Sequence, residues 1–298
     1  MNETALLFGP RKALVGILTA PATGAPPGDR PGVVILNAGL LHRVGPNRVH
    51  VQMARFLAEQ GFAVLRFDLS GIGDSRPREG VVTIADSVME DTREALDLME
   101  RMTGLRRFLL IGICSGADIA LFAATQEPRV VGAALIDGYF APTFGFRVGR
   151  QLRRVFTLRS WLRLLTGQSQ VWSVVVDALA APRRREQSEP RGRGPRFPPV
   201  AKYRESVRAA VTRGVALLLV YTEDGPSLYH YRRSMEKQIP RWAARQPVSV
   251  EYFDGSDHVF TLRVNQERIV RILSHWASTV LPEPQGVADG PSEEGRPG

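Results

Sequence analysis

Cysteine is the residue this sequence has least of, with one in 298 residues, so an internal disulfide is excluded and we expect a reducing compartment. No apolar run approaches the about eighteen residues that a membrane-spanning helix needs. The start, Met1-Asn2-Glu3-Thr4, has no basic segment leading into an apolar stretch. We therefore expect no membrane span, no secretory signal and a cytoplasmic location.

The sequence also lacks the residue patterns that bind metal ions or dinucleotides. Histidines and carboxylates nowhere cluster at metal-ligand spacing, and Gly71-Ile72-Gly73 lacks the third glycine of the dinucleotide fingerprint. We expect neither a metal nor a cofactor. The net charge of +9 invites a nucleic-acid interpretation. However, the arginines that crowd between Arg147 and Arg213 follow neither a pattern of regularly interleaved aromatic residues nor a zinc-finger spacing, so they indicate a solvated basic surface. Nothing in the sequence indicates an oligomeric state.

The apolar pattern indicates an α/β protein. Short β-rich runs predict strands at Leu14–Leu18, Val33–Leu36, Ala63–Phe67, Phe108–Ile113, Val130–Ile136, Val215–Tyr221 and Val248–Phe253. Helical patterns lie at Asn47–Gln60, Ile84–Met102, Asp118–Thr125, Leu228–Ala244 and Arg263–Val280. Continuous apolar strands separated by helices are typical of a mostly parallel sheet covered by helices on both faces.

The strand–helix alternation breaks in the middle of the chain. Residues 140–213 contain helical patterns followed by a stretch rich in Pro, Gly and Arg, and they predict a helical insertion. Residues 1–139 and 214–280 then form the sheet domain, and residues 281–298 predict a disordered tail. An insertion between two strands of one sheet is well placed to form a lid over the carboxyl ends of the strands, where such sheets bind ligands.

The single cysteine lies in a turn built for a nucleophile. A buried strand runs into Gly112-Ile113-Cys114-Ser115-Gly116, and a helix follows. This is the G-x-nucleophile-x-G elbow, whose sharp turn needs small residues two places before and two places after the nucleophile. The helix N-terminus favours the thiolate of Cys114. Ser115 is one place off the apex, so its side chain should point elsewhere, while its backbone N–H suits an oxyanion hole.

A nucleophile of this kind needs a base, and after an elbow the expected chain order is nucleophile, acid, histidine. Among five histidines, His258 follows the last predicted strand and should share the sheet edge with Cys114, so we predict it as the base. His42 follows an early strand, where it can contact substrate, but its place in the order is wrong for the base.

The acid is expected at the end of a strand that precedes the histidine. Asp224, just after Val215–Tyr221, is the first choice, and Glu223 is the alternative. Asp137, at the end of Val130–Ile136, is a third candidate, because the acid can stand one strand earlier. Asp257 adjoins His258, but adjacent residues rarely reach the required geometry.

Together these motifs resemble the α/β-hydrolase superfamily, in particular the serine-aminopeptidase-like and exosortase-A-system-associated hydrolases, over roughly residues 10–280. The resemblance rests on the segment Asn37–Arg48, the D-x-x-G-x-G-x-S turn within Phe67–Ser75, the Cys114 elbow and the Asp257-His258 loop. Cysteine replaces the commoner serine of the superfamily, as in dienelactone hydrolases and polyhydroxyalkanoate synthases.

The resemblance implies further roles. The turn at Asn37–Leu40 stands where many relatives have His-Gly and would supply the second oxyanion N–H, from Gly39 or alternatively from Leu40. The residues of the D-x-x-G-x-G-x-S turn would be structural, namely Asp68, Gly71, Gly73 and Ser75.

We therefore expect a hydrolase that attacks a small-molecule ester or thioester through Cys114, Asp224 and His258 and forms an acyl-thioester enzyme. One alternative is an acyltransferase, in which an acceptor other than water removes the acyl group and the basic insertion docks an acidic carrier protein or the phosphates of coenzyme A. Another alternative is a non-catalytic binding module on the same scaffold, because fold alone does not give function.

Overall fold

The computed structural model describes residues 2–22, 30–80, 83–138, 200–222 and 248–280. The chain divides into two units, one made of Met1–Tyr139 with Pro199–Gly298 and the other of Phe140–Pro198. The second unit, the predicted helix Leu228–Ala244 and the predicted disordered tail at 281–298 lie outside the described residues. The helical lid and the tail therefore stay predictions.

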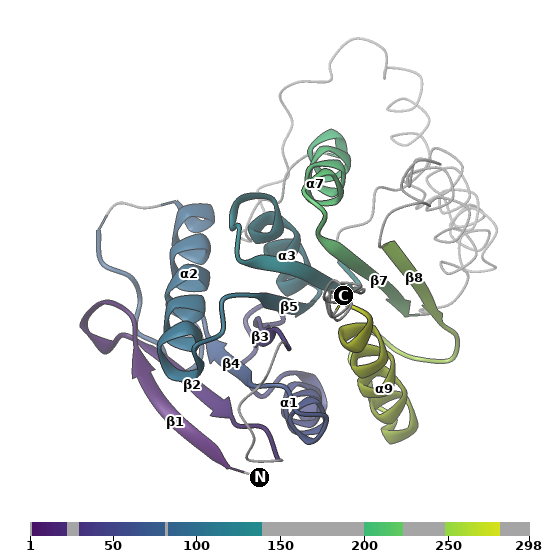
Figure 1. The fold of residues 1–298 in the computed structure, drawn as a ribbon, viewed down its shortest axis with the longest axis horizontal. Helices are drawn as coiled ribbons and strands as arrows, with labels where there is room; N and C mark the ends of the chain where they lie inside the picture. The colour runs from purple at the N-terminus through teal and green to yellow at the C-terminus, as the bar shows by residue number, and fades with distance from the viewer. Residues whose placement is uncertain (1, 23–29, 81–82, 139–199, 223–247, 281–298) are drawn as a thin grey trace, which may run out of the picture. The chain divides into compact units, whose positions relative to one another are not determined.

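An eight-stranded sheet forms the centre of the described unit, with strand order β1-β2-β4-β3-β5-β6-β7-β8 (Figure 1). The pairs β1–β2 and β2–β4 are antiparallel, and all later pairs are parallel. The strands are β1 (Glu3–Phe8), β2 (Leu14–Thr19), β3 (Gly32–Ile35), β4 (Val64–Asp68), β5 (Phe108–Ile113), β6 (Val130–Ile136), β7 (Ala216–Thr222) and β8 (Val248–Phe253). The predicted α/β fold with a mostly parallel sheet is confirmed.

Helices cover both faces of this sheet. One face carries α1 (Val49–Glu59) and α9 (Arg263–Thr279), which contact each other, and the other carries α2 (Ile84–Thr103), α3 (Ser115–Gln126) and α7 (Val200–Thr212) (Figure 1). Short 3-10 turns lie at Pro10–Lys12 (η1) and Pro46–Arg48 (η2). None of the helices in the described part of the chain is long and apolar enough to cross a membrane.

Two elements differ from the sequence-based expectation. The strand β1 was not predicted, because it lies at the edge of the sheet and half of its side chains face solvent. The helix α7 falls inside the predicted insertion, yet it belongs to the sheet unit and packs against α3. The sheet unit therefore resumes by residue 200 rather than at residue 214.

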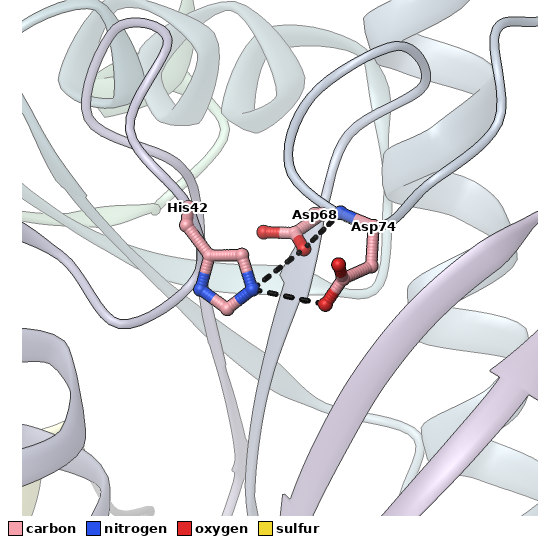
Figure 2. A group of neighbouring side chains, drawn as sticks. All are labelled: His42, Asp68 and Asp74. Atoms are coloured by element: carbon pink, nitrogen blue, oxygen red, sulfur yellow. Dashed lines mark hydrogen bonds and ion pairs between the residues drawn. The ribbon is translucent and has the colours of Figure 1, made fainter.

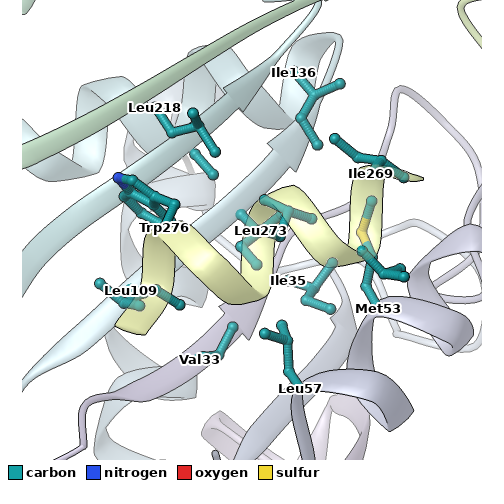
Figure 3. Packing of buried hydrophobic residues seen from close by; sticks show 14 of the residues in the cluster. Val33, Ile35, Met53, Leu57, Leu109, Ile136, Leu218, Ile269, Leu273 and Trp276 are labelled. Atoms are coloured by element: carbon teal, nitrogen blue, oxygen red, sulfur yellow. The ribbon is translucent and has the colours of Figure 1, made fainter. Parts of the chain in front are cut away.

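The helix α9 shows how the apolar pattern builds the core (Figure 3). Ile269, Leu273 and Trp276 are spaced so that they share one face of the helix, and all three are buried. They pack in one cluster with buried strand residues, including Val33, Ile35, Leu109 and Leu218. Burial of side chains this large stabilises a fold by about 2–3 kcal/mol each. The same cluster includes Phe253 at the end of β8 and Phe260 in the loop that precedes α9.

The order of the central strands determines where a site can form. From β3 the chain passes to β4 on one side and then to β5 on the other, so the loops after β3 and β5 leave the sheet in different directions. Such a switch point opens a crevice at the carboxyl ends of the strands. Asn37 follows β3 at this edge, and Cys114 follows β5.

Candidate functional site

The backbone at Cys114 forms a strained elbow. Its φ of 56° and ψ of −121° place a non-glycine residue in a region that is unfavourable for a side chain. A Cβ on Gly112 would lie 2.1 Å from the backbone of Gly116, and a Cβ on Gly116 would lie 2.4 Å from the carbonyl oxygen of Asn37. Both glycines are therefore required, as the elbow pattern predicts. The Cys114 N–H donates to the carbonyl of Ile136 at 2.8 Å, which holds the turn against β6.

The thiol of Cys114 lies in hydrogen-bond contact with His258. This contact is the main cause that lowers the pKa of Cys114, a backbone hydrogen bond from Ser115 adds to it, and partial burial opposes it. The pKa of His258 is raised to about 10, first by its hydrogen bond to Asp137 and then by the bond to Cys114. Both shifts act in the direction of a thiolate–imidazolium pair.

Asp137 is the acid that contacts the histidine. His258 Nδ1 lies 2.9 Å from Asp137 Oδ2, which leaves Nε2 as the ring nitrogen available to the sulfur. Asp137 also accepts hydrogen bonds from the backbone N–H of Thr222, at 2.7 Å, and from its hydroxyl. The carboxylate is largely buried, with 11% of its side chain exposed. Two of the three candidate acids, Asp224 and Glu223, lie outside the described residues.

The loop that carries His258 is fixed from several directions. Phe260 is fully buried and packs edge-on against Phe253 at the end of β8. Asp257 accepts from the backbone N–H and the hydroxyl of Thr261, so its carboxylate turns into its own loop. The Asn47 side chain donates to the carbonyl of Val259 at 2.9 Å and ties this loop to the segment that follows β3. We call the group Cys114, Asp137 and His258 the triad cluster.

The turn after β3 lies directly beside the elbow. Gly39 has a left-handed φ of 60°, and its N–H donates to the Ser115 hydroxyl at 2.8 Å. Asn37, buried beneath the turn, donates to the carbonyl of Leu41 at 2.8 Å and accepts from the N–H of Leu69 at 2.7 Å. The side chain of Leu40 is 86% exposed. The turn predicted to supply an oxyanion donor is thus placed next to Cys114.

A second polar cluster lies at the same edge of the sheet. His42 Nε2 lies 3.1 Å from Asp74 Oδ2 and 3.5 Å from the buried Asp68 Oδ2 (Figure 2). The Arg43 Nη1 contacts all three groups, at 2.7 Å from His42 Nε2, at 2.8 Å from Asp74 and in an ion pair with Asp68. The bonds from His42 and Arg43 lower the pKa of Asp74. We call these four residues the guanidinium cluster.

The guanidinium cluster has the donor types of a metal site, since ligand atoms of His42, Asp68 and Asp74 lie within 4.8 Å of one another. The Arg43 guanidinium already contacts each of them, so a metal ion would have to displace it. Asp68 also accepts from the backbone N–H of Asp74 at 3.1 Å and of Arg43 at 2.5 Å. These contacts are those of a structural support.

The D-x-x-G-x-G-x-S turn supports this cluster in the way the resemblance implies. A Cβ on Gly73 would lie 2.4 Å from Asp68 Oδ2. The hydroxyl of Ser75 donates to the carbonyl of Asp68 at 2.6 Å and accepts from the N–H of Val15 at 2.9 Å. The turn therefore connects β4 to β2. His42, proposed from the sequence to contact substrate, lies in this network.

Sequence reasoning missed one residue of the site, Thr222, and the side-chain contact of another, Ser115. Thr222 holds Asp137 with both its backbone and its hydroxyl, but it is an ordinary strand-end residue in the sequence. The hydroxyl of Ser115 was expected to point away, and it binds the Gly39 turn instead. Neither contact has a local sequence signal, because each joins segments that are far apart along the chain.

Comparisons with known proteins bear on the family and the fold of the chain. The family model described as "Serine aminopeptidase, S33" matches residues 16–209, which is more than half of the chain. A Klebsiella pneumoniae protein named as the carbamate hydrolase RutD is 29% identical over 159 residues, which cover 53% of this chain and 52% of that protein. The chain thus spans about half the length of the curated relative it matches.

Solved structures show the same fold. A dienelactone hydrolase from Anabaena variabilis superposes with a TM-score of 0.56 at 14% identity, covering 94% of this chain and 99% of that one. The esterase Pf2001 from Pyrococcus furiosus superposes with a TM-score of 0.57 at 15% identity, covering 94% and 91%. At these identities the structural likeness establishes the α/β-hydrolase fold.

Proposed function

Because the chain belongs to the serine aminopeptidase S33 family of α/β-hydrolases, we propose that it hydrolyses small-molecule esters or thioesters with Cys114 as its nucleophile. The observation that carries the proposal is the contact series from Cys114 to His258 to Asp137 at the carboxyl edge of the sheet. It combines an activated sulfur, a proton carrier and an orienting acid, which are the three parts that acyl transfer to a side chain needs.

The first half of the reaction follows from the resting charges. The Cys114 thiolate attacks the carbonyl carbon, and the carbonyl oxygen becomes an oxyanion. The N–H of Ser115 bonds the sulfur and is the first donor to the oxyanion, and the turn at Gly39 and Leu40 lies next to Ser115 through the bond from the Gly39 N–H to the Ser115 hydroxyl. As the tetrahedral intermediate collapses, His258 Nε2 gives its proton to the departing alcohol or thiol. The acyl group is then held on Cys114 as a thioester.

The second half regenerates the enzyme. His258 is now neutral, and it takes a proton from water as the water oxygen attacks the thioester carbonyl. Collapse releases the free acid and the Cys114 thiolate, and His258 is again an imidazolium. Asp137 keeps Nδ1 protonated and the ring oriented throughout. No metal or cofactor takes part in this sequence.

Hydrolysis is tested with an acyl thioester and an acyl 4-nitrophenyl ester, each without any added acceptor. We expect free acid from the wild-type protein and none above background from Cys114→Ala. Product that forms only when an alcohol, amine or thiol is added would contradict hydrolysis and identify an acyltransferase with the same acyl-enzyme. Turnover by Cys114→Ala at the wild-type rate would contradict the nucleophile itself.

A further inference from the structure

The side chain of Ser115 forms a bond that its position beside the elbow does not predict. Its Oγ accepts the N–H of Gly39 at 2.8 Å, across 76 positions of sequence. A serine hydroxyl that accepts one hydrogen bond still has its own proton to donate. No described residue accepts that proton in the hydrogen bonds of this structure. The hydroxyl of Ser115 is therefore a donor held in place beside the nucleophile.

The same bond occupies the N–H expected to contact an oxyanion directly. Gly39 cannot easily turn away, because Leu41 N–H bonds to the carbonyl of Ala38 at 3.1 Å and the buried Asn37 bonds to the carbonyl of Leu41. The close approach of Gly116 to the Asn37 carbonyl also holds the turn and the elbow against each other. A direct role for the Gly39 N–H would require this contact with Ser115 to break.

We propose that the hydroxyl of Ser115 is a further catalytic group that donates its proton in a hydrogen bond to the oxyanion, while the Gly39 N–H holds and polarises it. The donors to the oxyanion are then the Oγ–H and the backbone N–H of one residue. A chain of hydrogen bonds from N–H to O–H to an anion strengthens each member. This inference rests on the proposed function, because it concerns the oxyanion that attack by Cys114 creates.

The test compares two reactions of the same sulfur. Acylation by 4-nitrophenyl acetate creates an oxyanion, whereas alkylation by iodoacetamide displaces iodide from a saturated carbon and creates none. For Ser115→Ala we expect acylation to fall by about tenfold to a hundredfold, through kcat rather than KM. Alkylation of Cys114 should stay within about twofold of wild type, with an unchanged pH profile. Ser115→Thr keeps the hydroxyl and should keep most of the acylation rate.

Two results would overturn the inference. Acylation by Ser115→Ala at the wild-type rate or faster would show that the Gly39 N–H serves the oxyanion directly once the hydroxyl is gone. Equal losses of acylation and alkylation would show that Ser115 only maintains the elbow. Failure of the proposed function looks different, because Cys114→Ala would then turn over the ester as fast as the wild-type protein does.

Discussion

The triad cluster and the guanidinium cluster lie at one edge of one sheet, and both place a cation between polar groups. In the guanidinium cluster the cation is Arg43, and a guanidinium has five N–H donors and no acceptor with which to take up a proton. In the triad cluster it is His258, whose Nδ1 faces Asp137 and whose other ring nitrogen, Nε2, can exchange a proton with the sulfur of Cys114. The first arrangement locks charge in place, and the second can transfer a proton. Only the second can carry acid–base chemistry.

The largest expected effect is on catalytic rate, and it should distinguish His258 from His42. His258→Ala removes the proton carrier and should lower kcat/KM for an ester by about 10⁴-fold. His42→Ala, the matched control in the guanidinium cluster, should lower it by less than about tenfold, since its Nε2 bonds to Asp74 and Arg43. Steady-state kinetics on both variants measures the ratio. Equal losses would mean that the guanidinium cluster takes part in the chemistry.

The next effect concerns the acid. Asp137→Asn should lower kcat/KM by about 10³-fold, because the imidazolium and its orientation depend on the carboxylate. Asp137 raises the pKa of His258, so its loss lets His258 deprotonate at lower pH and raises the pKa of Cys114. The pH midpoint of iodoacetamide alkylation should therefore move upward.

Asp257→Asn is the control for this effect, because Asp257 binds Thr261 within its own loop. We expect a wild-type alkylation midpoint and kcat/KM within about fivefold of wild type. A midpoint that stays in place in Asp137→Asn would leave the acid to be sought in residues 223–247.

The third prediction concerns the structural role of Arg43 in the guanidinium cluster. Arg43→Met leaves the fully buried Asp68 without its main counter-charge, and it should lower the free energy of unfolding by about 3–5 kcal/mol. The exposed Arg76→Met is the control and should change it by less than about 0.5 kcal/mol. Denaturant unfolding at pH 7 gives both values. Similar stabilities for the two variants would show that Arg43 is not a structural cation.

The smallest expected effect is on stability, and it occurs only at acidic pH. His50 on α1 is fully buried, and this burial, with the charge of Arg66, lowers its pKa to about 4. The folded protein thus binds this proton more weakly than the unfolded chain does, so the contribution to stability is present above about pH 6.5 and is lost as the pH falls to about 4.

The free energy of unfolding is measured at pH 7 and at pH 4 for the wild-type protein and for His50→Leu. Between these two pH values it should fall by about 3 kcal/mol more in the wild-type protein, since one pKa unit corresponds to about 1.4 kcal/mol. Identical pH dependence in the two proteins would contradict a neutral buried His50.

The elbow was predictable because its signal is local. Gly112 and Gly116 stand two places from Cys114, and the steric reason for each acts over a few residues. The choice of acid was not predictable in the same way. Asp137 and Asp224 both follow strands that end at one edge, and strand order alone does not decide which carboxylate reaches His258. Among the described residues, the three-dimensional structure brings Asp137 into contact with His258, and we propose it as the acid on that ground.

The limits of the fold prediction have similar causes. The strand β1 pairs at an edge with half of its side chains in solvent, so its apolar pattern is weak. The helix α7 follows a stretch rich in Arg and Pro, and for that reason the sequence pattern assigns it to the predicted insertion. The bond from Gly39 to Ser115 depends on the adjacency of β3 and β5, and no local pattern carries that information.

A covalent acyl intermediate on Cys114 can be trapped and located. The protein is mixed with an activated acyl ester, quenched in acid within milliseconds to seconds, and analysed by intact mass and peptide mapping. We expect one added acyl group, located on Cys114, released by neutral hydroxylamine as a thioester is, and absent from Cys114→Ala. An acyl group on Ser115, or continued turnover by Cys114→Ala, would contradict this expectation.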